Sequence, residues 1–310
     1  MNITLKTALT IAGTALGTLA AIGYVFVIGS VYSNHVKDNV YIIHSENPLS
    51  RIGANMVAFN TGLRWVLVDT HLGPLASGAL SEIKSIADQP VPIAFNSHWH
   101  PDHSGGNSTF TDEADIVAHQ FVLDILSAPH AASGLTAPGS THAYNATAKA
   151  GLPETIVTDR QLFVIDGKKF SAVHYPSAHT GGDLVVFAKD FNVVALGDLI
   201  WPGGFPFIDV QNGGSAMGLA RALDKILSES DVATVFIAGH GQPMTYAEVK
   251  SYSTMVRETI SFVQNQRTTG IIVAEIQTQG LSKKWRGWSS DLVPESEWIR
   301  MVAADIKDAN

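Results

Sequence analysis

His98-Trp99-His100-Pro101-Asp102-His103 decides both the fold and the chemistry of this 310-residue chain. The stretch follows a short apolar run, residues 91–95, which is typical of a buried strand. Imidazole and carboxylate are preferred ligands of zinc and its first-row neighbours, and this density of them is hard to explain by structural needs. Cysteine, the usual ligand of structural zinc, is absent from the chain. The stretch therefore predicts a catalytic metal site, where water keeps a coordination position.

Three further candidate ligands follow, each near a glycine and near the end of a predicted strand. They are His179 in the segment 177–183, Asp198 after the run 193–196, and His240 after the run 234–238. Strand ends hold binding groups rigidly, and glycine lets the backbone approach a ligand closely. We therefore expect these side chains to converge on the His98–His103 stretch.

The order of these residues resembles the metallo-β-lactamase superfamily, which carries H-x-H-x-D-H, then His, then Asp or Cys, then His. The resemblance runs from about Val40 to Tyr246. It implies an α/β fold, the four-layer αββα sandwich. It also implies two metal sites: His98, His100 and His179 in the first, Asp102, His103 and His240 in the second, and Asp198 bridging both. Asp69 matches the family's upstream aspartate and is expected to support the metal loop by hydrogen bonds.

The resemblance implies two Zn²⁺ ions as cofactors, and Mn or Fe also suits a ligand set of nitrogen and oxygen atoms. Two divalent ions, two carboxylates and one hydroxide leave a net charge of about +1, which stabilises an anionic transition state. A metal lowers the pKa of its bound water to about 7. The zinc-bound hydroxide then needs no Ser or Cys nucleophile, and Asp102 is the candidate catalytic residue that orients it or carries a proton.

We expect a zinc-dependent metallo-hydrolase that cleaves an ester, lactone, thioester or amide bond of a small molecule. A β-lactam is not favoured, because Asp198 replaces the Cys of thiolate-using β-lactamases and Trp201 stands where those enzymes often carry Lys. Two alternatives stay open: hydrolysis of a phosphoryl or sulfuryl ester on the same site, and a non-catalytic metal-binding protein at the membrane. The net charge of -8, without a long basic run, argues against nucleic acid as a partner.

The N-terminus predicts a membrane anchor. Residues 8–31 contain no charged side chain, and about 20 apolar residues span a bilayer as a helix. Because Lys6 precedes this run, residues 1–32 are expected to be a transmembrane helix with the catalytic domain on the periplasmic side. A cleaved signal peptide is the alternative, with Ile28-Gly29-Ser30 as a weak cleavage site, and it would make the protein periplasmic or secreted.

After the anchor we expect a linker at residues 33–39, a catalytic domain at 40–250 and a C-terminal helical extension at 251–310 that packs on it. Predicted strands cover 40–43, 55–59, 65–68, 91–95, 170–175, 184–188, 193–196 and 234–238. Predicted helices cover 75–87, 117–126, 216–227, 245–267, 271–279 and 295–307. Residues 129–151 are expected to be a long loop, and 201–214 either an apolar wall over the metals or a core-packing loop. The sequence does not predict the oligomeric state.

Overall fold

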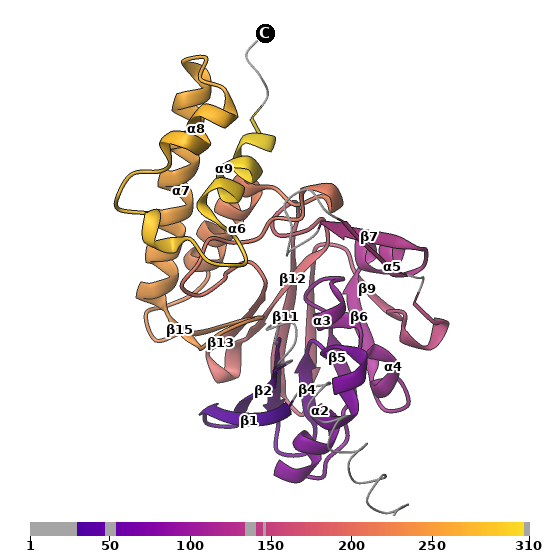
Figure 1. The fold of residues 1–310 in the computed structure, drawn as a ribbon. Coiled ribbons are helices and arrows are strands. Elements are labelled where there is room, and N and C mark those ends of the chain that lie inside the picture. Colours follow the sequence, from indigo (N-terminus) through magenta and orange to yellow (C-terminus); the bar gives the residue numbers. More distant parts are fainter. Residues whose placement is uncertain (1–29, 47–53, 134–140, 145–146, 307–310) are drawn as a thin grey trace, which may run out of the picture.

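The computed structural model describes residues 30–46, 54–133, 141–144 and 147–306 (Figure 1). Residues 1–29, which carry most of the predicted anchor, lie outside the described residues. Within the described part, no helix combines the length and the apolar character needed to cross a membrane. The last residues of the predicted anchor, 30–32, instead begin the first strand.

Two mixed sheets form the centre of the molecule. The first sheet has the strand order β1-β2-β3-β4-β5-β6-β9. Its strands are β1 (Ser30–Lys37), β2 (Val40–Glu46), β3 (Asn55–Asn60), β4 (Trp65–Val68), β5 (Ile93–Phe95), β6 (Asp115–His119) and β9 (Thr155–Val157). The pairs from β1 to β4 are antiparallel and those from β4 to β9 are parallel. The carboxyl ends of β4, β5 and β6 therefore meet at one edge, where candidate site residues follow β4 and β5.

The second sheet has the order β10-β11-β12-β13-β14-β15. Its strands are β10 (Arg160–Ile165), β11 (Lys168–Tyr175), β12 (Asp183–Ala188), β13 (Val193–Gly197), β14 (Val235–Ala238) and β15 (Met244–Thr245). Only the pair β13–β14 is parallel. Because β13 and β14 run side by side in the same direction, the residues after them, Asp198 and His240, leave the sheet at the same edge.

Apolar side chains from both sheets fill the space between them. Phe59 of the first sheet lies 5.5 Å from Phe170 of the second and 5.3 Å from Phe191, measured between ring centroids. These rings belong to a cluster of buried residues that both sheets contribute, with Val117 among them. Burying such rings removes large apolar areas from water, which holds the two sheets face to face.

Helices cover the outer faces of the two sheets (Figure 1). Beside the first sheet lie α2 (Gly73–Ile86), α3 (Pro101–Ser104), α4 (Asn107–Phe110) and α5 (Gln120–Leu126). Beside the second sheet lie α6 (Ala216–Ser228), α7 (Tyr246–Thr268), α8 (Val273–Gln279) and α9 (Glu295–Ala304). Ala76, Ala79 and Ile83 of α2 pack on the first sheet, whereas α6, α7 and α9 share one large apolar cluster with the second.

Helix α7 begins at the predicted capping box. The hydroxyl of Thr245 accepts a hydrogen bond from the Glu248 backbone N–H (3.3 Å), and the Glu248 carboxylate accepts one from the Thr245 N–H (2.7 Å). Trp298 of α9 is fully buried; its ring stacks on Phe205 (5.8 Å) and its Nε1–H donates to Thr259 Oγ1 of α7 (2.9 Å). The C-terminal helices therefore share buried contacts with the sandwich.

Three local predictions were wrong. Residues 33–37 of the expected linker belong to β1, an edge strand that pairs with β2 and binds Glu82 of α2 through Ser33 (2.6 Å). An edge strand buries few side chains, so its sequence stays polar and resembles a linker. Residues 117–126 form β6 and then α5 rather than one helix, because pairing with β5 and burial between the sheets outweigh the helical spacing. The helix begins at residue 120, where the His119 ring accepts from the Phe121 N–H (3.1 Å).

The third error concerns residues 129–151, which are not a structureless loop. They include the antiparallel hairpin β7 (His130–Ser133) and β8 (Thr141–Tyr144), in which residue 130 pairs with residue 144. A segment rich in Ala, Ser and Thr gives little side-chain signal for a pairing made by backbone hydrogen bonds. The edge strand β10 was not predicted either. Its Leu162 and Val164 are apolar but exposed, so the strand is held by pairing with β11 rather than by burial of these side chains.

Candidate metal centre

Three histidine rings converge at the edge where the two sheets meet. His98 and His100 follow β5, and His179 lies in the turn between β11 and β12. His100 Nδ1 is 2.9 Å from His98 Nε2 and 3.1 Å from His179 Nε2. The three side chains are buried, so they meet in a space largely closed to solvent.

The outward nitrogen of His98 has a defined hydrogen-bond partner. Ser97 Oγ donates to Asp69 Oδ2 (2.8 Å) and therefore accepts from His98 Nδ1–H (3.0 Å). This network places the ring proton of His98 on Nδ1. Its Nε2, which faces the other two rings, consequently carries a lone pair.

The other two rings are oriented in the same way. His179 Nδ1–H donates to the carbonyl oxygen of Phe207 (2.8 Å), and His100 Nε2–H donates to Asp209 Oδ2 (3.1 Å). All three inward nitrogens therefore carry lone pairs, and these point at one another. Such lone pairs repel unless a cation lies between them, so the arrangement fits a metal ion bound by three imidazoles.

A second cluster lies beside the first. Asp102 Oδ2 is 3.5 Å from the Nε2 atoms of both His103 and His240. His103 Nε2 and Asp198 Oδ1 are 3.3 Å apart but are not oriented for a hydrogen bond; both atoms are buried and lack a hydrogen-bond partner among the described residues. A ring nitrogen and a carboxylate oxygen left without partners at one point fit a second metal ion.

Asp198 faces both clusters. Its Oδ2 is 3.3 Å from His240 Nε2, 3.9 Å from His179 Nε2 and 4.0 Å from His98 Nε2. In the described part of the chain, the ligand atoms form two groups, one of His98, His100, His179 and Asp198, the other of Asp102, His103 and His240, and the atoms of each group lie within 4.8 Å of one another. The seven residues predicted as ligands are thus brought together, with Asp198 between the two groups.

The electrostatics of the second cluster favour bound positive charge. Burial raises the pKa of Asp102, but the neighbouring His103 and His240 lower it more, so this carboxyl stays ionised. Burial lowers the pKa of His103, but Asp198 and Asp102 raise it well above its usual value. Asp102 and Asp198, two largely buried carboxylates, therefore favour a cation beside them, which either protons or a metal ion supply.

Two rings of the first cluster, His98 and His179, favour neutral imidazole. Burial and the neighbouring His103 hold the pKa of His98 well below its usual value. Burial, together with His100, lowers the pKa of His179 to about 4. Neutral imidazole is the form that binds a metal ion, so these rings need not lose a proton at neutral pH before binding.

Asp69 makes the contacts expected of the upstream aspartate. Its Oδ2 accepts from His103 Nδ1–H (2.8 Å), and its Oδ1 accepts from the Ser97 backbone N–H (2.7 Å). Asp69 is buried and has φ of +70°, a left-handed conformation that is uncommon outside glycine. One carboxylate thus holds a ring of the second cluster and the backbone beside the first.

Asp209 was not singled out from the sequence. It is fully buried, and its Oδ2 accepts from His100 Nε2–H and from Asn212 Nδ2 (2.8 Å). Burial raises its pKa, but hydrogen bonding to His100 lowers it below its usual value. A signal was available, because Asp209 is the only acidic residue in the apolar segment 201–214.

Replacing Asp209 by alanine should weaken metal binding to the first cluster about 10–100-fold, since His100 loses the acceptor that fixes its ring. Competition with a chelator of known affinity measures this change. Asp305→Ala is the matched control: Asp305 accepts from Ser215 Oγ (2.8 Å) and the Met217 N–H (3.0 Å) near the same segment but contacts no site histidine. Equal metal affinities for the two variants would contradict the role given to Asp209.

Segment 201–214 combines both predicted roles. The Trp201 ring lies 4.3 Å from the His240 ring, and the Phe207 ring lies 5.8 Å from that of His179, so both border the histidines. Phe205 is instead fully buried against Trp298. Part of the segment therefore lies against the site, and part anchors it to the core.

A second histidine pair lies outside the metal centre. His119 stacks on His174 with ring centroids 3.6 Å apart, and His174 Nε2–H donates to the Gly181 carbonyl (3.1 Å), two residues after His179. Burial and the neighbouring His174 lower the pKa of His119, and Asp124 opposes them only in part, so that the pKa lies at about 4. Burial also lowers the pKa of His174, against the effect of Asp159.

This pair predicts a loss of stability in acid. The folded pKa of His119 lies below its unfolded value of about 6.5, so the unfolded chain binds more protons between about pH 6.5 and 4, and stability falls as the pH falls through that window. His119→Asn keeps an N-cap acceptor for α5 and should flatten this slope. Urea midpoints measured across the window test it, and an unchanged slope would refute the assignment.

The chain belongs to the metallo-β-lactamase superfamily, because the model of that family matches residues 50–240, more than half of the chain. Among curated proteins, it is 24% identical over 163 residues to the lactamase-like protein aptB of Emericella nidulans, covering 52% of this chain and 45% of that protein. It is 23% identical over 158 residues to an atrochrysone carboxyl ACP thioesterase of Aspergillus chevalieri, covering 51% and 43%. The chain thus spans less than half the length of these two relatives.

Solved structures share the fold. A metallo-β-lactamase from Pontibacter korlensis superposes with a TM-score of 0.60 at 16% identity, covering 74% of this chain and 99% of that one. The sec-alkylsulfatase Pisa1 from Pseudomonas sp. superposes with a TM-score of 0.64 at 18% identity, covering 90% and 50%. The chain is thus a member of this superfamily whose fold brings together two His/Asp clusters suited to metal ions.

Proposed function

We propose that this chain is a dinuclear metal hydrolase that cleaves an ester, lactone, thioester or amide bond of a small molecule. The observation that carries the proposal is the position of Asp198, whose carboxylate faces the histidines of both clusters. One ion would be held by His98, His100 and His179. The other would be held by Asp102, His103 and His240, and Asp198 would bind both. The proposed ion is Zn²⁺, and Mn or Fe suits the same ligands.

When bound, two divalent ions would supply a hydroxide at neutral pH and positive charge for the developing oxyanion. The chain itself would provide orientation. The Asp102 side chain is 16% exposed, more than those of His103 and His240, so it is the carboxylate of the second cluster that a water can reach. Its ionised oxygen would accept a hydrogen bond from the attacking water and align it, or receive its proton.

Two observations support a carbonyl substrate without a charged recognition group. Trp201 lies against His240, where lactam-cleaving relatives often carry Lys, so a β-lactam is the least favoured amide. No Lys or Arg side chain is buried in the described part of the chain. One relative is a carboxyl ACP thioesterase, so thioesters belong among the substrates to be tested.

Sulfuryl or phosphoryl ester hydrolysis is the second candidate. The alkylsulfatase structure covers 90% of this chain, whereas the β-lactamase structure covers 74%. At 18% identity this likeness concerns the fold, and the substrate has to be measured. The membrane anchor and the periplasmic location likewise stay predictions from residues 1–32.

Elemental analysis and a substrate panel test the proposal. Purified protein should contain about two transition-metal ions per chain; one or none would contradict the dinuclear site. The panel contains nitrocefin, an acyl lactone, a thioester, a carboxyl ester, a phosphodiester and an alkyl sulfate. Turnover of a carbonyl probe supports the proposal, and turnover of the sulfate or phosphodiester alone selects the second candidate. Bound metal without any turnover would indicate a non-catalytic metal-binding protein.

A further inference from the structure

We propose that Trp201 is the specificity-determining residue of this site and that its indole binds an uncharged, apolar group of the substrate next to the scissile bond. The inference rests on the proposed hydrolase function and deepens it. Trp201 would act as a binding surface, and Tyr252 would act through it as a positioning residue.

The position of the indole carries the proposal. Its ring lies 4.3 Å from the ring of His240 and is tilted 35° to it. Trp65, Trp99 and Trp298 are fully buried, whereas Trp201 keeps part of its surface exposed. The indole thus contacts His240 of the second cluster and is also partly exposed to solvent. A molecule bound at this cluster can therefore contact it.

The turn that carries Trp201 is tightly packed. A Cβ atom on Gly204 would lie 2.9 Å from Trp201 Cδ1, so a larger residue at this position would displace the indole. Gly241, next to His240, has φ of +77°, and a Cβ atom there would lie 3.1 Å from Pro202. Glycine at both positions lets the two segments approach, and this holds the indole against His240.

Helix α7 fixes the backbone of the turn. The fully buried Tyr252 accepts a hydrogen bond from the Trp201 N–H at its phenol oxygen (3.1 Å), and its ring lies 5.5 Å from that of Trp288. The Trp288 carbonyl accepts from the Phe205 N–H (2.9 Å). Both ends of the turn are therefore tied to the C-terminal region.

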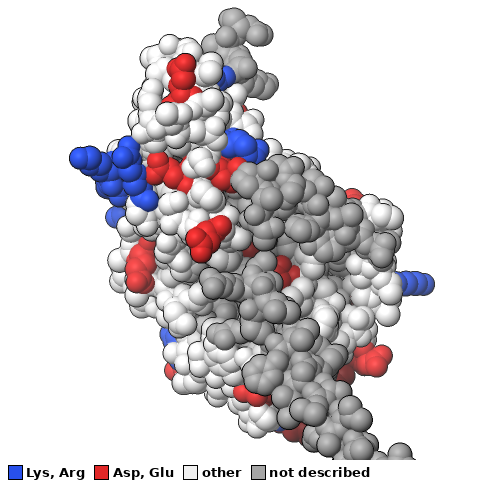
Figure 2. Space-filling view, viewed as in Figure 1, with Lys and Arg blue, Asp and Glu red and all other residues white. Residues whose placement is uncertain are grey.

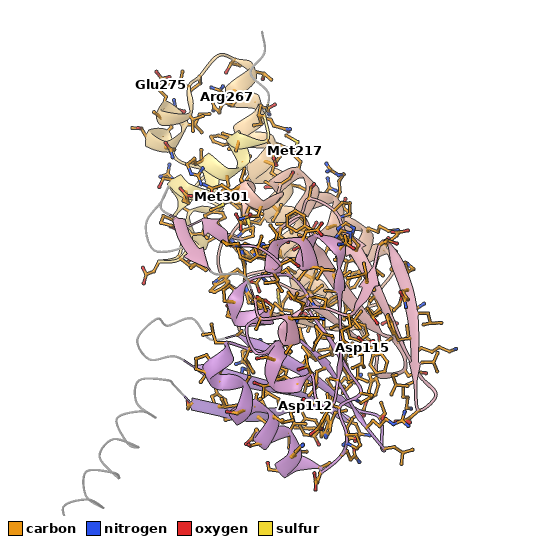
Figure 3. All side chains as sticks on the ribbon, turned by 90° about the vertical axis from the view of Figure 1, so that its right-hand side faces the viewer. Asp112, Asp115, Met217, Arg267, Glu275 and Met301 are labelled. Atoms are coloured by element: carbon orange, nitrogen blue, oxygen red, sulfur yellow. The ribbon has the colours of Figure 1, made fainter. Side chains whose placement is uncertain are left out.

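Further along the same segment, α9 makes a similar contact. Met301 lies where the C-terminal helices meet the sandwich (Figure 3), and its Sδ accepts from the Ile208 N–H (3.3 Å). Met217 of α6 lies near the same junction, and its Sδ accepts from Gln264 of α7 (3.7 Å). The segment that borders the histidines is thus held by helices that lie beyond the family match.

The apolar character of the indole favours an apolar ligand group. On the face shown in Figure 2, the largest group of Lys and Arg side chains lies over the C-terminal helices. An alkyl or aryl group placed on the indole gains from burial against an apolar ring. Each methylene removed from water contributes roughly fourfold in affinity, so contact with about two methylenes is worth roughly tenfold.

Two homologous series of carboxyl esters test the proposal in the metal-loaded enzyme. One series varies the acyl chain from acetate to octanoate with a p-nitrophenyl leaving group, and the other varies the alcohol of an acetate ester. The wild type should prefer the long member of at least one series in kcat/KM. Trp201→Ala should reduce that preference about tenfold, whereas Trp201→Phe should keep most of it because a ring remains. Preferences equal in the wild type and Trp201→Ala would overturn the inference.

Tyr252→Phe removes the acceptor of the Trp201 N–H and should reduce the same preference by a smaller factor, mainly through KM. Ser253→Ala is the matched control, because it removes a hydrogen bond made by the next residue of α7, also buried, to Asp224 of α6 (3.2 Å) rather than to the Trp201 turn. Both variants should lower the unfolding midpoint, but only Tyr252→Phe should change the chain-length preference. Equal preferences in the two variants would assign Tyr252 a merely structural role.

A binding measurement separates failure of this inference from failure of the proposed function. Calorimetry with octanoate and acetate on the metal-loaded protein needs no turnover. Octanoate should bind the wild type about tenfold more tightly than it binds Trp201→Ala, while acetate should bind both equally. Equal octanoate affinities would overturn the indole surface even in an active hydrolase. If octanoate affinity differs about tenfold as expected but the protein hydrolyses no ester, the apolar binding role of Trp201 stands and the proposed ester hydrolase is refuted.

Discussion

Replacing Asp198 by alanine is expected to lower kcat at least about 10³-fold and to reduce the metal content from about two ions per chain to about one or fewer. The reason is the position of its carboxylate between the clusters, 3.3 Å from nitrogens of both His103 and His240 and about 4 Å from His98 and His179. Without it, the histidines of both clusters lose the negative charge between them. Elemental analysis and initial rates on the best substrate measure both effects.

Two further variants sharpen this test. Asp198→Asn keeps the size of the side chain but removes its charge, so a similar loss of metal would assign the effect to charge. Asp190→Ala removes an exposed carboxylate that accepts from the Lys169 N–H (2.6 Å) in the hairpin beyond β12, and should leave activity unchanged. Wild-type rates and metal content in Asp198→Ala would exclude the bridging role.

Asp69→Asn is the second change with a large expected effect. It should cost about 2–4 kcal/mol of unfolding free energy and weaken metal binding about 10–100-fold. The reason is that an amide has one oxygen and cannot accept both from the Ser97 N–H on one side and from Ser97 Oγ and His103 Nδ1–H on the other. Asparagine tolerates the positive φ at this position better than alanine does, so backbone strain does not obscure the result. Urea unfolding and chelator competition provide the two readouts.

The control for Asp69 is Asp166→Asn, since Asp166 also has a positive φ (+50°), which asparagine tolerates. Asp166 also accepts a side-chain hydrogen bond, from Thr61 (2.6 Å), and forms an ion pair with Arg64 (3.6 Å), but it lies in a surface turn. Loss of these contacts should cost no more than about 1 kcal/mol and leave metal affinity unchanged. Should Asp69→Asn behave like this control, the link between Asp69 and the metal centre would be lost.

The convergence of the seven candidate ligands could be predicted from sequence because their chemistry is local. His98, His100, Asp102 and His103 form a dense group of metal-binding side chains, and His179, Asp198 and His240 follow apolar runs that predict strands. Asp209 could not be recognised in this way. It acts through a hydrogen bond to His100, and no spacing rule connects two residues that meet only after the 201–214 segment has folded over the site.

The same distinction explains the fold predictions. Strands buried between the sheets, such as β3 and β13, carry continuous apolar runs and were recognised from them. The edge strands β1 and β10 expose much of their surface, and the hairpin β7–β8 lacks a run of large apolar residues, so their pairing depends on neighbours that the local sequence does not reveal. In β6, the contact with β5 overrode a helical pattern that was present in the sequence.

The shared packing of α7 and α9 bears on how this chain can be truncated or recombined with relatives. The family match ends at residue 240, yet Tyr252, Met255 and Trp298 belong to the same apolar cluster as Phe236 of β14. Ending the chain there would uncover one face of the second sheet and release the segment that carries Trp201. The unit that folds is therefore larger than the unit that homology outlines, and exchanging substrate preference between relatives would require moving the distal helices together with the loop they support.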